Sequence, residues 1–249
     1  MEQDIKIEIT DSSQDILNLI DQSIPQLSID CVIFGFHENE LKVLLSKYPN
    51  LDLWGLQGGY VLQNEDIDAA AKRILEERTG LEDIFLKQFH TFGKANRPTF
   101  GVLKKAFQEM SIDIEDVPFF RQRFVSIGYY SLVDFLKVTP KSGLFTERSE
   151  WFDIQNLPTL VFDHADMVEK ALETMRHSLD YHLVGFNLLP ETFTMKALQH
   201  LYETILGEKL RRNNFQEKML NMNILERLEK QFTGKAHKAP YLYRYKKDV

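Results

Sequence analysis

The sequence predicts an α/β protein, in which helices sandwich a mixed sheet and a smaller C-terminal module follows. Apolar strand candidates alternate with two well-marked amphipathic helices over residues 28–182. Beyond them the order becomes helix, tight joint, helix and hairpin, and the charge turns from acidic to basic. We therefore expect an N-terminal extension at 1–27, a first domain at 28–182 and a second domain at 183–249.

The composition is that of an ordinary globular protein, with 249 residues, 43% hydrophobic and 27% charged. Its apolar runs are far shorter than the ~20 residues that span a membrane, and the N-terminus lacks the features of a secretion signal. A single cysteine, Cys31, excludes an internal disulfide and a cysteine-based zinc site. We expect a cytoplasmic protein without a membrane partner.

The first domain is expected to start with a strand at Ser28–Phe36 that pairs with Leu41–Lys47. Ile67–Arg78 has helical periodicity, and Gly80 is suited to a left-handed C-cap. The remaining expected elements are strands at Phe85–Phe92 and Phe124–Phe135, an inserted helix and loop at Phe100–Gln122, and a helix from Asp163 to about His182.

One segment carries a recognisable motif. Residues 59–81 read GYVLQNEDIDAAAKRILEERTGL. This spacing resembles the Nudix box, Gly-x5-Glu-x7-Arg-Glu-U-x-Glu-Glu-x-Gly-U, in which U is a bulky apolar residue. The matching residues are Gly59, Glu65, Arg73, Leu75, Glu77, Gly80 and Leu81. Two carboxylates of the pattern are missing, because Ile74 and Arg78 stand in their places.

The two replacements change the expected chemistry. Nudix hydrolysis uses divalent metal, and hard cations need a cluster of carboxylate oxygens. Arg78 is a permanent cation that repels a metal and is able to bind an anion directly. We therefore expect a Nudix-like fold that keeps its shape without catalytic residues, a bound metal or a cofactor.

The expected effector site lies around this motif. Its candidate residues are Trp54, Gln57, Gly59, Arg73, Glu77 and Arg78, together with Lys47 and Tyr130. Plainer roles stay open for several of them: Trp54 fits a core position, and Arg73 is spaced to pair with Glu77. Glu65 and Glu76 fit solvated helix charges, and His90 fits a core histidine.

The C-terminal part differs in charge. Residues 181–249 hold 12 Lys and Arg against 7 Asp and Glu, whereas the other 180 residues hold 18 against 30. Thr194 is placed to cap a helix at Met195–Leu206, and a second helix is expected at about Asn213–Met222. Strands at Ile224–Glu229 and Pro240–Lys246 follow, which completes the pattern of a winged helix-turn-helix.

A helix that enters the major groove needs cations and polar side chains near its start. The candidate DNA-binding residues are Arg211, Arg212, Asn213, Asn214 and Lys218 around the second helix, with Lys235 and Lys238 in the hairpin loop. The alternative is a solvated basic surface on a small helical dimerisation domain.

Residues 186–194 (FNLLPETFT), 198–207 (LQHLYETILG) and 214–218 (NFQEK) resemble the Nudix-related transcriptional regulators, the NrtR/AraR-like family. So do Phe162–Ala165 and Thr91–Gly93 in the first domain, and the likeness spans residues 28–247. It implies a homodimer that binds operator DNA and senses a small-molecule effector, either a pentose sugar or an ADP-ribose-like nucleotide. The insertion departs from the family near the expected pocket, which leaves the effector open.

Two other functions are compatible with the sequence. The first is a metal-dependent Nudix hydrolase of nucleoside diphosphate derivatives whose C-terminal domain only dimerises. The second is a sugar- or nucleotide-binding adaptor without DNA affinity. Hydrolysis abolished by Glu77→Gln would indicate the hydrolase, and ligand binding without salt-dependent duplex affinity would indicate the adaptor.

Overall fold

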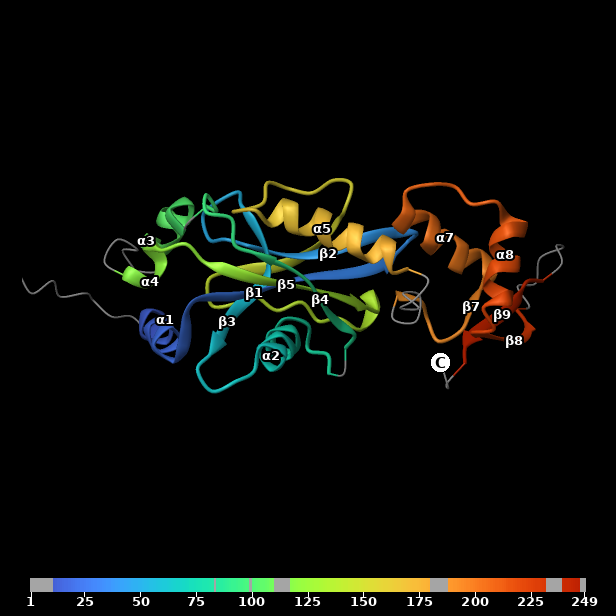
Figure 1. Ribbon diagram of the computed structural model, residues 1–249, viewed down its shortest axis with the longest axis horizontal. Coiled ribbons are helices and arrows are strands. Elements are labelled where there is room, and N and C mark those ends of the chain that lie inside the picture. Colours follow the sequence, from blue (N-terminus) through green and yellow to red (C-terminus); the bar gives the residue numbers. More distant parts are fainter. Residues whose placement is uncertain are drawn as a thin grey trace, which may run out of the picture.

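The computed structural model describes residues 11–82, 84–98, 100–109, 117–179, 188–231 and 239–246. A six-stranded sheet with flanking helices occupies one part of the long axis, and a smaller helical unit with its own sheet occupies the other (Figure 1). Within the described ranges, no helix combines the length and apolar composition that crossing a membrane requires.

The large sheet has the order β4-β5-β1-β3-β2-β6. Its central strand β1 pairs in parallel with β5, with Cys31 opposite Tyr129, and the other pairings in the sheet are antiparallel. This confirms the expected mixed sheet. The strands are β1 (Ser23–His37), β2 (Glu40–Lys47), β3 (Trp54–Leu62), β4 (Leu86–Phe92), β5 (Val125–Val133) and β6 (Arg148–Asp153).

Helices cover both faces of this sheet because its central strand is apolar on both sides. Ile29, Cys31 and Ile33 pack in one cluster with the buried face of α2 (Ile67–Thr79). The alternating residues Val32 and Phe34 belong to the opposite cluster, beneath α5 (His164–His177). The result is the expected α/β/α sandwich, with α2 and α5 on opposite sides (Figure 1).

The first strand begins earlier than expected. Helix α1 spans Asp11–Gln22, and β1 begins at Ser23 rather than Ser28. Gln26 has a φ of 57°, and the pairing of β1 with β3 shifts register between Ser23 and Ser28. This irregularity breaks the two-residue alternation by which a strand is recognised in sequence.

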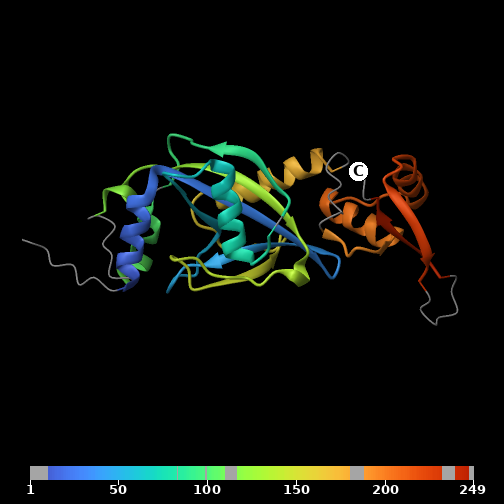
Figure 2. The same cartoon turned by 90° about the horizontal axis from the view of Figure 1, so that it is seen from below.

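The inserted segment forms more than one helix. It holds a 3₁₀ turn at Phe100–Leu103, α3 at Lys104–Glu109 and α4 at Pro118–Arg121. Phe107 and Phe120 of this segment join Ile16 of α1 and Tyr60 of β3 in a buried cluster. The insertion and α1 therefore lie together at one end of the sheet (Figure 2).

The C-terminal elements have the winged helix-turn-helix order. They are β7 (Phe193–Thr194), α7 (Met195–Leu206), α8 (Arg212–Asn221), β8 (Leu225–Lys230) and β9 (Tyr241–Tyr245), and the strands form a sheet in the order β7-β9-β8. Thr194 Oγ1 accepts the Ala197 N–H at 3.1 Å, as its expected capping role requires. Gly207 ends α7 with a φ of 77°.

The two parts contact each other through α5. Met175 and Leu179 share a buried cluster with Leu198 and Ile205 of α7. Arg176 Nε donates to the Ile205 carbonyl at 2.6 Å, which places a cation at the carboxyl end of α7. Helix α5 ends at His177, earlier than the expected His182, and residues 180–187 lie outside the described residues.

Candidate functional site

A cavity opens where the middle of β3 meets the first half of β1. Loop 143–146 and the end of loop 93–98 complete its walls together with Phe124. The lining residues are Leu19, Ser28, Ile29, Asp30, Ser46, Tyr48, Leu56, Gln57, Gly58, Gly59, Tyr60, Arg78, Arg97, Pro98, Phe124, Gly143, Leu144, Phe145, Thr146, Phe162 and His164. It is an apolar pocket with a few polar side chains, the usual composition of a ligand site.

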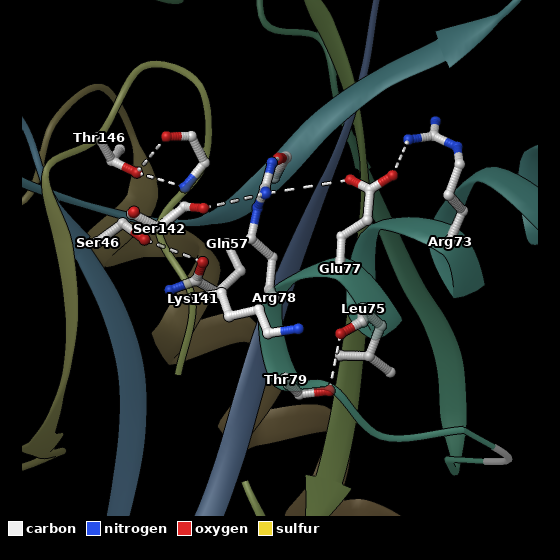
Figure 3. Close-up of polar contacts among 12 residues, drawn as sticks. Ser46, Gln57, Arg73, Leu75, Glu77, Arg78, Thr79, Lys141, Ser142 and Thr146 are labelled. Atoms are coloured by element: carbon white, nitrogen blue, oxygen red, sulfur yellow. Dashed lines mark hydrogen bonds and ion pairs between the residues drawn. The ribbon is translucent and has the colours of Figure 1, made fainter. Parts of the chain in front are cut away.

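Arg78 reaches this cavity from the last turn of α2 (Figure 3). Its side chain is only 16% exposed. Nη2 donates to the Gly58 carbonyl at 3.4 Å and Nη1 to the Ser142 carbonyl at 3.5 Å. Burial lowers the pKa of Arg78, but a guanidinium remains protonated at neutral pH. The cavity therefore contains a buried positive charge.

The other departure from the motif, Ile74, is fully buried beneath β3. A Cβ added to Gly59 would lie 2.9 Å from Cδ1 of Ile74, so strand and helix are in close contact there. A hydrocarbon side chain fills the place where the Nudix pattern has a carboxylate. In the part of the chain that the structure describes, no three His, Cys, Asp or Glu side chains form a metal-binding group. The donor set does not fit the divalent metal that Nudix chemistry implies.

Arg73 and Glu65 form a structural pair at the start of the motif. Arg73 Nη2 lies 2.6 Å from Glu65 Oε1 and donates to the Tyr60 carbonyl at 3.0 Å, and Nη1 lies 3.2 Å from Glu77. The hydrogen bond from Arg73 lowers the pKa of Glu65, which also accepts the Leu62 N–H at 2.8 Å. Glu65 is thus not the solvated charge that its position in the sequence indicated; it ties the loop before α2 to the helix.

A buried polar network also lines the cavity. Arg97 Nε donates to both carboxylate oxygens of Asp163, at 2.9 and 2.8 Å, and its Nη2 lies 3.7 Å from Asp30. Asp30 accepts a short hydrogen bond from Ser126. The network joins β1, β5, loop 93–98 and the start of α5, so it fixes the shape of the cavity wall.

His164 belongs to the same network. Its Nδ1 accepts the Leu56 N–H at 2.9 Å, and Nε2 lies 3.6 Å from Asp30 Oδ1. Burial lowers the pKa of His164, which favours the neutral ring. Because Nδ1 is an acceptor, the neutral ring carries its proton on Nε2, facing Asp30.

The sequence did not single out Asp30, Arg97 or His164 as site residues. One available signal was an Asp inside the otherwise apolar run 29–36. The others were Arg97, in a loop after a strand, and the segment 162–165, in which His164 follows Asp163 at the N-cap position of α5.

The structure brings only part of the expected effector set together. Gln57, Gly59 and Arg78 line the cavity, and Gln57 Oε1 accepts a hydrogen bond from Ser46 at 2.9 Å. Arg73 and Glu77 lie on α2 beside it, outside the lining. The effector contacts of this set remain predictions.

The other three candidates lie elsewhere. Trp54 is buried against Phe152, with ring centroids 4.6 Å apart, so its alternative core role is the one observed. Tyr130 is fully buried in the cluster beneath α5, on the other face of the sheet. Lys47 forms an ion pair with Glu147 at 3.1 Å. His90, expected in the core, is exposed on β4, at a point where the pairing with β5 shifts register between Gln88 and His90.

The second candidate site is the exposed face of α8. Phe215 and Met219 anchor the helix in the core. The expected DNA-binding residues Arg211, Arg212, Asn213, Asn214 and Lys218 are all exposed on α8 or at its N-cap. Lys235 and Lys238 lie outside the described residues.

A groove beside α8 adds residues that the sequence had not indicated. Arg212 and Gln216 line it together with Lys196 of α7 and Lys230 of β8. Its volume, about 640 Å³, exceeds the roughly 120 Å³ of the cavity near Arg78. Size alone therefore does not identify the small-molecule site. The buried polar side chains around the smaller cavity favour it, whereas a groove lined by Lys196, Arg212 and Lys230 suits a polyanion.

Two known protein families match the two parts of this chain. The model of the NUDIX domain matches residues 24–171, more than half of the chain. The chain belongs to the NUDIX domain family. The model of the NrtR DNA-binding winged helix domain matches residues 185–245, after the NUDIX domain.

Three known proteins are similar to most or part of this chain. An ADPR responsive transcriptional repressor NtrR of Acinetobacter baylyi is 28% identical over 90% of this chain and 84% of its own. The structure of Shewanella oneidensis NrtR complexed with a 27mer DNA has a TM-score of 0.68 and 26% identity, covering 90% of this chain and 94% of that one. An ADP-ribose pyrophosphatase of Methanocaldococcus jannaschii is 26% identical over 58% of this chain and 72% of its own.

Proposed function

We propose that this protein is a transcriptional repressor that binds operator DNA through its winged helix and responds to ADP-ribose bound in its NUDIX domain. One observation supports this proposal above the others. The motif helix presents a buried guanidinium and a buried isoleucine where metal-binding carboxylates are needed, and the same chain carries an exposed basic recognition helix. A domain that binds a ligand without cleaving it, joined to a DNA-binding domain, is the arrangement expected of a ligand-responsive regulator.

The effector assignment rests on the relatives and on the charge of the cavity. The Acinetobacter baylyi relative is named as ADPR responsive, and its likeness covers both domains of this chain. ADP-ribose carries a diphosphate, which suits a buried cation, whereas a free pentose has no anionic group. We therefore favour the nucleotide over the sugar that the family resemblance also allowed.

We further propose that the protein acts as a homodimer that does not hydrolyse its effector. Two winged helices in a dimer meet half-sites about one DNA turn apart, so a small change in their relative position lowers affinity. The effector shifts this equilibrium only by as much as it prefers one arrangement over the other.

DNA binding is tested by fluorescence anisotropy with a duplex from the region upstream of the protein's own coding sequence. We expect salt-dependent binding, weakened by ADP-ribose. Arg212→Ala should lower affinity and reduce the slope of log K against log salt by about 1, as the loss of one phosphate contact does. Arg121→Ala, an exposed arginine of α4 far from α8 (Figure 1), is the matched control and should change neither.

Hydrolysis is tested on the same preparation with ADP-ribose and Mg²⁺ or Mn²⁺. We expect no turnover because the metal ligands are replaced. Turnover that Glu77→Gln abolishes would contradict the non-catalytic assignment and favour the hydrolase, a class to which the Methanocaldococcus jannaschii relative belongs. Absence of duplex binding at moderate salt, with and without ADP-ribose, would contradict the regulator itself.

A further inference from the structure

The cavity lining contains two guanidinium groups in different electrostatic surroundings. Arg97, 5% exposed, contacts Asp163 at 2.8 Å and lies 3.7 Å from Asp30, so two carboxylates compensate its charge. The other ionisable side chains of the lining are neutral: burial lowers the pKa of His164 and raises the pKa of Tyr48 and Tyr60.

Arg78 is the contrasting case. Its two hydrogen bonds, at 3.4 and 3.5 Å, are long and end on carbonyl oxygens. The nearest carboxylate observed among the described residues is Glu77, at 4.0 Å, which is 45% exposed and also pairs with Arg73. A guanidinium has five N–H donors, and leaving a buried charge weakly compensated is costly. The cavity therefore favours an anion beside Arg78.

The backbone fixes where this charge stands. A Cβ added to Gly143 would lie 2.7 Å from Nη2 and 2.9 Å from Cζ of Arg78. The guanidinium thus packs directly on the glycine backbone, between loop 141–146 and β3 (Figure 3). Such packing restricts the orientation of the Arg78 guanidinium before a ligand binds. The entropy that is lost on binding is therefore smaller.

We infer that Arg78 takes the place of the divalent cation in this NUDIX domain: it binds the diphosphate of the effector directly and makes binding independent of metal. A planar guanidinium donates two parallel hydrogen bonds to phosphate oxygens and so supplies the positive charge that a metal otherwise provides. Gly143 is a positioning residue for it. The inference rests on the proposed function, because it takes the effector to be a nucleoside diphosphate derivative.

The test is calorimetric titration of the full chain with ADP-ribose, with inorganic pyrophosphate and with adenosine, each in EDTA and in Mg²⁺. We expect the wild type to bind ADP-ribose equally in both buffers. Arg78→Gln should weaken ADP-ribose and pyrophosphate about 10- to 100-fold and leave adenosine unchanged, because only the charge-assisted bonds are lost. Arg78→Lys should recover part of this loss. Lys72→Gln, which removes an exposed cation from the same helix, is the matched control and should bind as the wild type does.

Gly143→Ala provides a second variant that keeps the charge and displaces it. It should weaken pyrophosphate and leave adenosine unchanged, a pattern that general unfolding would not produce. A Mg²⁺ requirement in the wild type, or unchanged phosphate affinity in Arg78→Gln, would overturn the inference. A third outcome separates the two proposals: the wild type binds pyrophosphate but not ADP-ribose, and Arg78→Gln no longer binds pyrophosphate. That result would support the phosphate-binding role of Arg78 and contradict ADP-ribose as the effector. If neither ADP-ribose nor pyrophosphate binds to the wild type in EDTA, the inference is overturned. Binding of the protein to the DNA duplex would still support its proposed role as a regulator.

Discussion

At the scale of single residues, Glu203 organises the joint between α7 and α8 of the winged helix domain. Its side chain is 9% exposed and accepts the Leu210 N–H at 3.0 Å and the Gln199 amide at 2.9 Å. Lys209 Nζ lies 3.2 Å away. The bond from Leu210, followed by those from Gln199 and Lys209, lowers the pKa of Glu203 to about 2. One carboxylate thus connects the end of α7 to the start of α8.

Glu203→Gln should therefore destabilise the winged helix. The pKa of this group is lower in the folded protein than in the unfolded chain, so its stabilisation is present above about pH 4.5 and is lost as the pH falls toward 2. We expect the variant to lower the free energy of unfolding by about 1–3 kcal/mol at pH 7, with a smaller difference at pH 3. Urea denaturation at both pH values measures this, with the exposed Glu208→Gln as control; a difference that grows on acidification would contradict it.

At the scale of elements, local signals predicted the motif helix and the C-terminal module well. Helix α2 has its apolar period and ends at Gly80 in the left-handed region with a φ of 72°. Helix α7 begins after Thr194 and ends at Gly207, as expected. These features depend on neighbours within four residues in the chain. The start of β1 escaped prediction because a positive φ at Gln26 interrupts its alternation.

The candidate site was predicted only in the part that lies within the motif or directly before it. Gln57, Gly59 and Arg78 line the cavity and come from one continuous stretch. Arg97 and Asp163 pair across 66 positions, and Asp30 and Ser126 across 96. Only the tertiary fold brings these residues together, so no spacing in the sequence indicates them. The prediction that Tyr130 belongs to the effector site was wrong for a related reason. The face of the sheet on which its side chain lies depends on the register of β5.

The packing of α2 leads to a prediction for its missing carboxylate. Ile74→Glu would put an unpaired charge into a fully buried apolar cluster, against Gly59. We expect a loss of about 3 kcal/mol or more in unfolding free energy and no gain of Mg²⁺-dependent ADP-ribose hydrolysis, because Arg78 still repels the metal. Thermal unfolding and a hydrolysis assay measure the two outcomes. Lys72→Glu, an exposed position of the same helix, should leave stability nearly unchanged, and hydrolysis by Ile74→Glu would contradict the account.

At the scale of the whole molecule, α5 connects the two candidate sites. His164 in its first turn lines the cavity, and its N-cap Asp163 holds Arg97. Near its other end, Arg176 donates to the Ile205 carbonyl of α7 at 2.6 Å. The helix has 14 residues and spans about 21 Å. A ligand that displaces the polar network would move the start of a rigid helix whose end is tied to the DNA-binding domain.

Arg176→Ala should consequently separate the two binding events. The variant removes the bond to Ile205 and touches neither the cavity nor α8, so ADP-ribose and operator DNA should each bind with near wild-type affinity. What should fall is the coupling: the ratio of the DNA dissociation constants with and without ADP-ribose, typically about 5- to 150-fold for an allosteric pair, should approach 1. Anisotropy titrations give this ratio directly. Lys170→Ala, on the same helix and paired locally with Glu173 at 2.7 Å, should keep it. A ratio equal to the wild type in Arg176→Ala would show that the signal passes by another route, for which the Thr204 hydrogen bond to the Asn39 carbonyl is the next contact to remove.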